Sequence, residues 1–186
     1  MTKETLILDT ECYRDYWMLG FMNAETQNVR AFECWGEGGR LSDASVTSIR
    51  NILERYRVIS FNGNNYDLPM ITAALNGATC AKLKELSDKI IVNNIKHWNL
   101  GIGEMVRCDH IDIFEVAPGM ASLKIYGGRL HCPKMQDLPI APGDSISPEQ
   151  REQLKTYNVN DLQTTLALFN HLKPQIELRE QMSKVY

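Results

Sequence analysis

Two carboxylates stand one residue apart at the end of an apolar run, in the segment Leu-Ile-Leu-Asp-Thr-Glu-Cys-Tyr that covers residues 6–13. In an extended strand, residues two apart point to the same face of the sheet. The side chains of Asp9 and Glu11 are therefore predicted to lie side by side, where their charges repel unless a proton or a cation compensates them. Hard divalent cations bind carboxylate oxygens, so the pair is a candidate metal site.

Two other acidic residues stand in segments that could join this pair. Asp67 follows the polar run Asn-Gly-Asn-Asn-Tyr and precedes Leu-Pro; an aspartate there is also an ordinary helix N-cap, and that alternative stays open. Tyr157 and Asp161 are four residues apart, so on a helix they share a face and can point into one cleft. The alternative is a half-buried tyrosine with a solvated aspartate one turn later.

The strands that position these residues are predicted from runs of apolar and aromatic residues between polar turns. Three such runs suggest an antiparallel meander at residues 5–11, 15–23 and 28–35. Two further strands are predicted at residues 57–63 and 110–114. Because a right-handed crossover makes the strand at 57–63 parallel to the first, Asp9, Glu11 and the segment 62–67 are expected at one edge of the sheet.

The helices alternate with the later strands, which predicts an α/β fold with a mixed five-stranded sheet flanked by helices. Ser42 and Ser147 are candidate N-caps, Pro148 suits the first helical position, and Gly77 suits the end of a helix. The expected helices cover residues 42–56, 67–76, 81–96, 120–127, 147–172 and a charged last helix at 173–186.

Length and composition indicate a single globular domain spanning residues 1–186. Its content of 44% hydrophobic and 23% charged residues is ordinary for a folded chain and argues against disorder. The formal net charge of -3 argues against a generally basic nucleic-acid coat. It leaves room for an enzyme whose acidic site is masked by bound metal.

The five cysteines are odd in number and dispersed, with no Cys-x-x-Cys pair. They suggest neither a disulfide framework nor a zinc cluster, and they fit a reducing compartment. No apolar stretch approaches the roughly 18 residues of a membrane span. The expected location is therefore the cytoplasm, of a bacterium or of a phage-infected host, without membrane association.

Taken together, the three acidic segments resemble the three exonuclease motifs of the DEDD superfamily, in its tyrosine-bearing branch. The motifs are Asp9-x-Glu11, then Asn62-x-x-x-x-Asp67-x-Pro69, then Tyr157-x-x-x-Asp161. The middle motif, Phe-Asn-Gly-Asn-Asn-Tyr-Asp-Leu-Pro, is similar to that of the proofreading exonuclease domains of family-B DNA polymerases, including those of bacteriophages. The resemblance extends from about residue 6 to residue 168 and implies an RNase H-like fold.

This resemblance implies a 3′–5′ exonuclease that hydrolyses single-stranded DNA ends with two divalent cations, Mg²⁺ or Mn²⁺. It implies that Asp9 bridges both ions, that Glu11 and Asp161 bind the ion holding the attacking water, and that Asp67 binds the second. Tyr157 would orient that water, because an unperturbed pKa near 10 makes its hydroxyl a poor base at neutral pH.

Candidate substrate contacts surround these acids. Backbone amides at Thr10 and Cys12 are expected near the terminal nucleotide, and Asn62 resembles a family position near the single strand. Aromatic side chains can stack on bases, and the candidates are Phe61, Tyr66 and Tyr126, with core packing as the alternative. The candidate phosphate contacts are Lys124, Arg129 and Lys134, with solvated surface charges as the alternative. Asp109 and Asp112 are expected to make hydrogen bonds at a strand edge, and the four histidines are unassigned.

Several alternatives remain at this point. The same motifs occur on ribonucleases, so an exoribonuclease or oligoribonuclease is the second enzyme hypothesis, and no sequence marker for the 2′-hydroxyl separates the two. A non-catalytic nucleic-acid-binding domain, or a protein whose acids are caps and surface charges, is less favoured because no acid is missing. The chain can also be the exonuclease part of a DNA polymerase, acting with a polymerase domain in cis or in trans.

Overall fold

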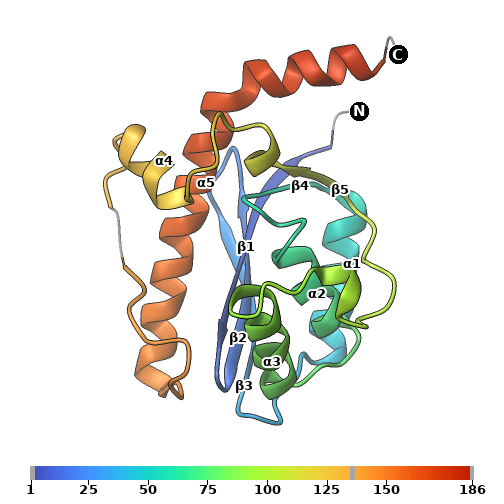
Figure 1. Ribbon diagram of the computed structural model, residues 1–186, viewed down its shortest axis with the longest axis vertical. Coiled ribbons are helices and arrows are strands. Elements are labelled where there is room, and N and C mark those ends of the chain that lie inside the picture. Colours follow the sequence, from blue (N-terminus) through green and yellow to red (C-terminus); the bar gives the residue numbers. More distant parts are fainter. Residues whose placement is uncertain (1–2, 135–136, 185–186) are drawn as a thin grey trace.

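The computed structural model describes residues 3–134 and 137–184 of the chain. A five-stranded sheet forms the centre, with helices on both faces (Figure 1). The strands are β1 (Thr5–Tyr13), β2 (Tyr16–Asn23), β3 (Val29–Trp35), β4 (Arg57–Ser60) and β5 (Asp109–Asp112). They lie side by side in the order β3-β2-β1-β4-β5. The predicted α/β fold with a mixed five-stranded sheet is confirmed, and the arrangement is consistent with an RNase H-like fold.

The pairing of the strands combines both orientations, as expected. β1, β2 and β3 form the antiparallel meander, whereas β4 lies parallel to β1 and β5 lies parallel to β4. The pairing of β1 with β4 stops at Ile7, so the second half of β1 extends past the end of β4. The segment from Asp9 to Glu11 therefore has no β4 partner and lies beside the loop that follows β4.

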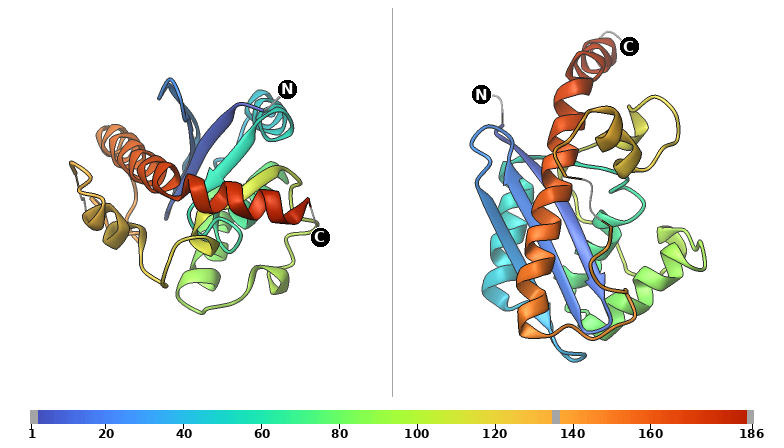
Figure 2. Two further views of the ribbon diagram at one scale, coloured as in Figure 1. Left: turned by 90° about the horizontal axis from the view of Figure 1, so that it is seen from above. Right: turned by 90° about the vertical axis from the view of Figure 1, so that its left-hand side faces the viewer.

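The two faces of the sheet are covered by different helices (Figures 1 and 2). The side chains of Leu6 and Leu8 belong to the core beneath α1, α2 and α3, whereas Ile7 belongs to the core beneath α5. Since side chains alternate along a strand, Asp9 and Glu11 face α5 and Thr10 faces the other helices. The helices are α1 (Asp43–Arg55), α2 (Asp67–Leu75), α3 (Cys80–Ile91), α4 (Leu123–Arg129) and α5 (Pro148–Ser183).

The C-terminal region corrects a prediction. Two helices were expected, at 147–172 and 173–186, but one continuous helix, α5, runs through Pro174; residues 185–186 lie outside the described residues. Proline lacks the N–H that would bond back to the preceding turn, and it bends helices; the change of direction is visible in Figure 1. The helix continues because Leu172 and Ile176, on either side of the proline, are both buried in the core beneath it.

Most other helix boundaries follow their local signals. Ser42 and Ser147 are N-caps, and the first turn of α5 has a full capping box with Gln150. The predicted helix at 81–96 is shorter than expected and ends at Ile91. A short 3-10 turn, η1 (His97–Asn99), follows it, and a second, η2 (Ile113–Glu115), follows β5. Within the described residues, no helix has the length and apolar content to cross a bilayer.

Candidate metal centre

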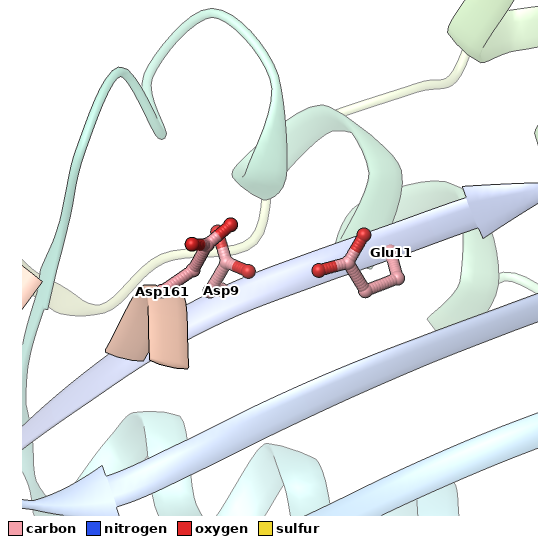
Figure 3. Close-up of side chains that lie close together, drawn as sticks. All are labelled: Asp9, Glu11 and Asp161. Carbon is pink, nitrogen blue, oxygen red and sulfur yellow. The ribbon is translucent and has the colours of Figure 1, made fainter. Parts of the chain in front are cut away.

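Three carboxylates from the two ends of the chain meet on the face of the sheet that α5 covers. One oxygen from each of Asp9, Glu11 and Asp161 lies within 4.8 Å of the others. Figure 3 shows Asp9 and Asp161 next to each other, with Glu11 further along β1. The spacing of two in a strand accounts for the first pair, and α5 brings in the third. Carboxylate oxygens alone form the set, which suits Mg²⁺ or Mn²⁺ better than a soft metal.

These acids lack cationic neighbours. In the described part of the chain, no lysine, arginine or histidine forms an ion pair with Asp9, Glu11, Asp67 or Asp161. Burial, followed by the negative charges of neighbouring acids, raises the pKa of Asp9 and of Glu11 well above their ordinary values. Glu11 and Asp67 are buried and Asp9 and Asp161 are partly buried. Carboxylates removed from water without a counter-charge are unfavourable, so the donor set and its charge both fit a divalent cation.

Asp67 joins the site from the opposite side of β1. Its oxygen Oδ1 accepts a bond from the Thr10 hydroxyl at 2.6 Å and another from the Thr10 amide at 3.0 Å. The alternative of an ordinary N-cap is wrong, because Tyr66 occupies the N-cap position of α2 and Asp67 is the first helical residue. Burial raises the pKa of Asp67 to about 7, against the opposing effect of the Thr10 hydrogen bonds.

Asp67 lies outside the closest group of oxygens, which contains only the other three acids. Its charge is nevertheless near enough to contribute to the raised pKa of Asp9. The charge of Asp67 also raises the pKa of Glu11, so Asp67 acts electrostatically on both acids of β1.

Tyr157 lies one helical turn before Asp161 and is 9% exposed. Burial raises the pKa of its hydroxyl, and the negative charges of Asp161 and Glu11 raise it further. The hydroxyl therefore stays protonated at neutral pH and can position a water molecule but not remove its proton. Tyr157 and Asp161 also line a cavity of about 190 Å³, together with Lys124 and Lys134.

Asn158 is a site residue that the sequence interpretation missed. Its side-chain nitrogen Nδ2 donates to Oδ2 of Asp9 at 2.8 Å, and the residue is 1% exposed. The signal was present, because Asn158 stands three residues before Asp161 and so shares its face of the helix. An asparagine beside Tyr157 had no distinguishing feature until the strand beneath it was placed.

A larger cavity of about 440 Å³ opens beside Asp9 and Asp67. Its walls come from the loop after β4 and from the end of α3 with the segment that follows. They include Phe61, Asn62, Asn65, Tyr66, Ile90, Ile91, Asn94, Ile95, Lys96 and His97. The segment 90–97 was not predicted to contribute, because nothing in its sequence resembles a motif; its position follows only from the packing of α3.

Asp112 holds the loop that forms one of these walls. Its carboxylate accepts bonds from the backbone amides of Asn62 at 2.7 Å, Asn64 at 3.0 Å and Phe114 at 3.1 Å. The expectation of a strand-edge hydrogen-bonding role is confirmed for Asp112. Asn62 has a positive φ of 63°, a left-handed conformation that asparagine adopts more readily than most residues with a side chain, and its amide donates to Asp112 in this conformation.

Two of the proposed substrate contacts are corrected by their surroundings. The backbone amide of Thr10 is already bonded to Asp67, so it is not available to a nucleotide. Tyr126 is 4% exposed and its hydroxyl donates to the carbonyl of Pro118 at 3.0 Å. Core packing, the alternative for this ring, is therefore its role.

The other candidates lie in different settings. The thiol of Cys12 packs against the core on the side of the sheet opposite Asp9. Phe61 packs edge-to-face against Phe114 and Tyr126, and it still lines the larger cavity. Tyr66 also lines that cavity, with its hydroxyl 2.8 Å from Ser87. Lys124 forms an ion pair with Asp137 and lines the smaller cavity. The guanidinium of Arg129 lies over the ring of Tyr126.

Comparisons of the chain with protein-family models, with curated proteins and with solved structures find no match.

Proposed function

We propose that this protein is a 3′–5′ exonuclease that hydrolyses single-stranded DNA ends to nucleoside monophosphates, with two divalent cations, Mg²⁺ or Mn²⁺. The observation that carries the proposal is the meeting of Asp9, Glu11 and Asp161 within 4.8 Å. Asp67 lies across β1 from them, bonded to Thr10. Among the described residues these four carboxylates have no cationic partner, and Asp9 and Asp67 line a cavity of nucleotide size. Cations that neutralise the four acids would make this a site for a phosphodiester.

The chain's own residues have distinct parts in this proposal. Asp9, Glu11 and Asp161 would hold one ion, and Asp9 with Asp67 the other. The bound cations would acidify a water molecule and neutralise charge on the phosphate and the leaving oxygen. Tyr157 would orient the water through a hydroxyl that remains protonated, as the raised pKa supports.

The cavity beside Asp9 and Asp67 would receive the terminal nucleotide. Its volume of about 440 Å³ is sufficient for one nucleotide, and its walls combine apolar side chains with amides. Phe61 and Tyr66, which line it, would contact a base, and Asn62 would bond to the sugar or phosphate. Lys124 and Lys134, which line the smaller cavity with Asp161, would contact the phosphates of the incoming strand.

The cellular context belongs to the proposal as well. A proofreading role beside a DNA polymerase, in the same chain or as a partner, accords with the motif resemblance. All five cysteines are free in the structure, which accords with a reducing cytoplasm.

The test uses single-stranded DNA and RNA of one sequence, labelled at the 5′ or at the 3′ end, with Mg²⁺ or Mn²⁺. We expect 5′-labelled DNA to shorten one nucleotide at a time, with loss of activity in EDTA and recovery on adding either metal. Shortening of RNA in preference to DNA would identify a ribonuclease. Binding without cleavage under all conditions would reject the enzyme and favour a binding domain.

A further inference from the structure

Asn158 is enclosed between α5 and the centre of the sheet. Its Nδ2 donates to Oδ2 of Asp9, whereas its Oδ1 is buried without a hydrogen-bond partner among the described residues. A buried amide oxygen without a partner lowers stability, so an apolar side chain of similar size would pack there at lower cost. The bond to Asp9 is therefore the contact that accounts for an amide at this position.

The sheet beneath Asn158 is shaped to admit it. Gly20 on β2 stands opposite Asp9 on β1. A Cβ atom added to Gly20 would lie 2.0 Å from Oδ1 of Asn158 and 3.0 Å from Cδ1 of Leu162. Glycine is disfavoured inside strands and often marks a close approach of another segment. Any larger residue at position 20 would displace the side chain of Asn158.

We propose that Asn158 is a positioning residue of the metal centre, which holds the carboxylate of Asp9 through Oδ2 and leaves Oδ1 of Asp9 for the cation. Gly20 is required for this role of Asn158, because its missing side chain leaves the space that the Asn158 amide occupies. Asn158 thus holds Asp9 in place beside the like-charged Glu11, a function that aspartate, with its charge, could not perform. The inference rests on the proposed cation binding.

The first measurement is calorimetric titration of Mn²⁺ into protein that has been stripped with EDTA and desalted. Loss of a hydrogen bond to a ligating group typically weakens metal binding by about 10- to 100-fold. We expect that loss for Asn158→Ala and Asn158→Leu. Asn170→Ala, which removes an exposed asparagine from the same helix, should bind as the wild type does. Folded Asn158 variants with wild-type Mn²⁺ affinity would show that Asn158 only packs, and would overturn the inference.

Gly20→Ala tests the same bond without changing Asn158. We expect it to weaken Mn²⁺ binding about as much as Asn158→Ala does, and the double variant to be no weaker than either single variant. Gly143→Ala is the matched control, because an added Cβ there has no atom within 4 Å. If the two losses multiply in the double variant, the residues act independently and the inference fails. Should Asn158→Ala not fold, the comparison of Gly20→Ala with Gly143→Ala decides the matter alone.

The positioning role of Asn158 and the proposed exonuclease activity can fail independently of each other. Mn²⁺ binding that depends on Asn158, in a protein that cleaves no nucleic acid, would reject the exonuclease and keep the positioning role. A wild-type protein that binds no Mn²⁺ would overturn the positioning role along with the metal site.

Discussion

Thr10 bonds to Asp67 twice, through its hydroxyl at 2.6 Å and its backbone amide at 3.0 Å, across 57 residues of sequence. Both donors reach one oxygen, Oδ1, of a carboxylate that is 3% exposed. The contact links the start of α2 to the second half of β1. It also holds the carboxylate of Asp67, which lines the larger cavity, in one position. Thr10 is therefore part of the candidate site through its hydrogen bonds to Asp67, and it also lines the larger cavity.

Replacing Thr10 with valine keeps the shape of the side chain and deletes one of these bonds. Since a hydrogen bond to a charged group contributes about 1.5–3 kcal/mol, we expect the free energy of unfolding at pH 8 to fall by about that amount. Urea denaturation measures it. Thr5→Val, on the same strand, should change stability little, and an equal loss in both variants would mean that valine itself is the cause.

Asp161→Asn should lower the rate of DNA hydrolysis by several orders of magnitude while leaving the fold intact. The same substitution should raise the stability of the metal-free protein at pH 8, because it removes one of several closely spaced negative charges that repel one another. Turnover and thermal unfolding in EDTA report the two effects. Asp144→Asn, in an exposed loop, is the control; full activity in Asp161→Asn would reject the metal-ligand role.

The metal-free protein should be less stable at pH 8 than at pH 5. The pKa of Asp67 is raised to about 7 by burial, and the pKa values of Asp9, Glu11 and Asp161 are raised as well. The folded state therefore binds more protons than the unfolded state between about pH 4 and pH 7, so stability falls as the pH rises through that window. Urea denaturation in EDTA measures the slope.

Saturating Mn²⁺ should reverse this pH dependence, because the cation binds the ionised carboxylates and stabilises only the folded state. Asp67→Asn should flatten the slope in EDTA, since it removes the carboxyl whose pKa lies near 7. A stability that is constant from pH 5 to pH 8 in EDTA would contradict the arrangement of buried acids described above.

Tyr157→Phe should slow hydrolysis less than Asp161→Asn does, by about 10- to 100-fold, as for other groups that orient a metal site. The variant deletes one hydroxyl beside Asp161 and no carboxylate. Single-turnover rates at saturating DNA and metal measure the effect, with Tyr56→Phe, at the end of α1, as the control. A wild-type rate would assign Tyr157 to packing alone.

Lys96→Ala should weaken binding of single-stranded DNA a few-fold and leave the rate at saturation unchanged. Lys96 lines the larger cavity and is not one of the clustered carboxylates, so we expect its charge to contact a backbone phosphate and to take no part in the chemistry. The KM for a labelled oligonucleotide, compared with that of Lys173→Ala on the far part of α5, is the measurement. A loss confined to the maximal rate would place Lys96 in the chemistry instead.

The amino-acid sequence alone determined the features that depend on local periodicity. A spacing of two in β1 placed Asp9 and Glu11 on one face, and a spacing of four on α5 placed Tyr157 with Asp161. The capping signals at Ser42 and Ser147 located the starts of two helices, and the alternation of strands and helices predicted the mixed sheet. These signals are reliable because each depends on residues within one turn or one strand.

Tertiary structure decided what depends on contacts between distant segments. The sequence left Asp67 as either a helix cap or a site residue, and its hydrogen bonds to Thr10 decided between them. Asn158 had no distinguishing feature in the sequence; only the fold shows that it lies against Gly20 and donates to Asp9. α5 continues through Pro174 because Leu172 and Ile176 are buried on either side of it, and burial outweighs the lost hydrogen bond. In each case the deciding free energy comes from a partner far along the chain, which no local pattern contains.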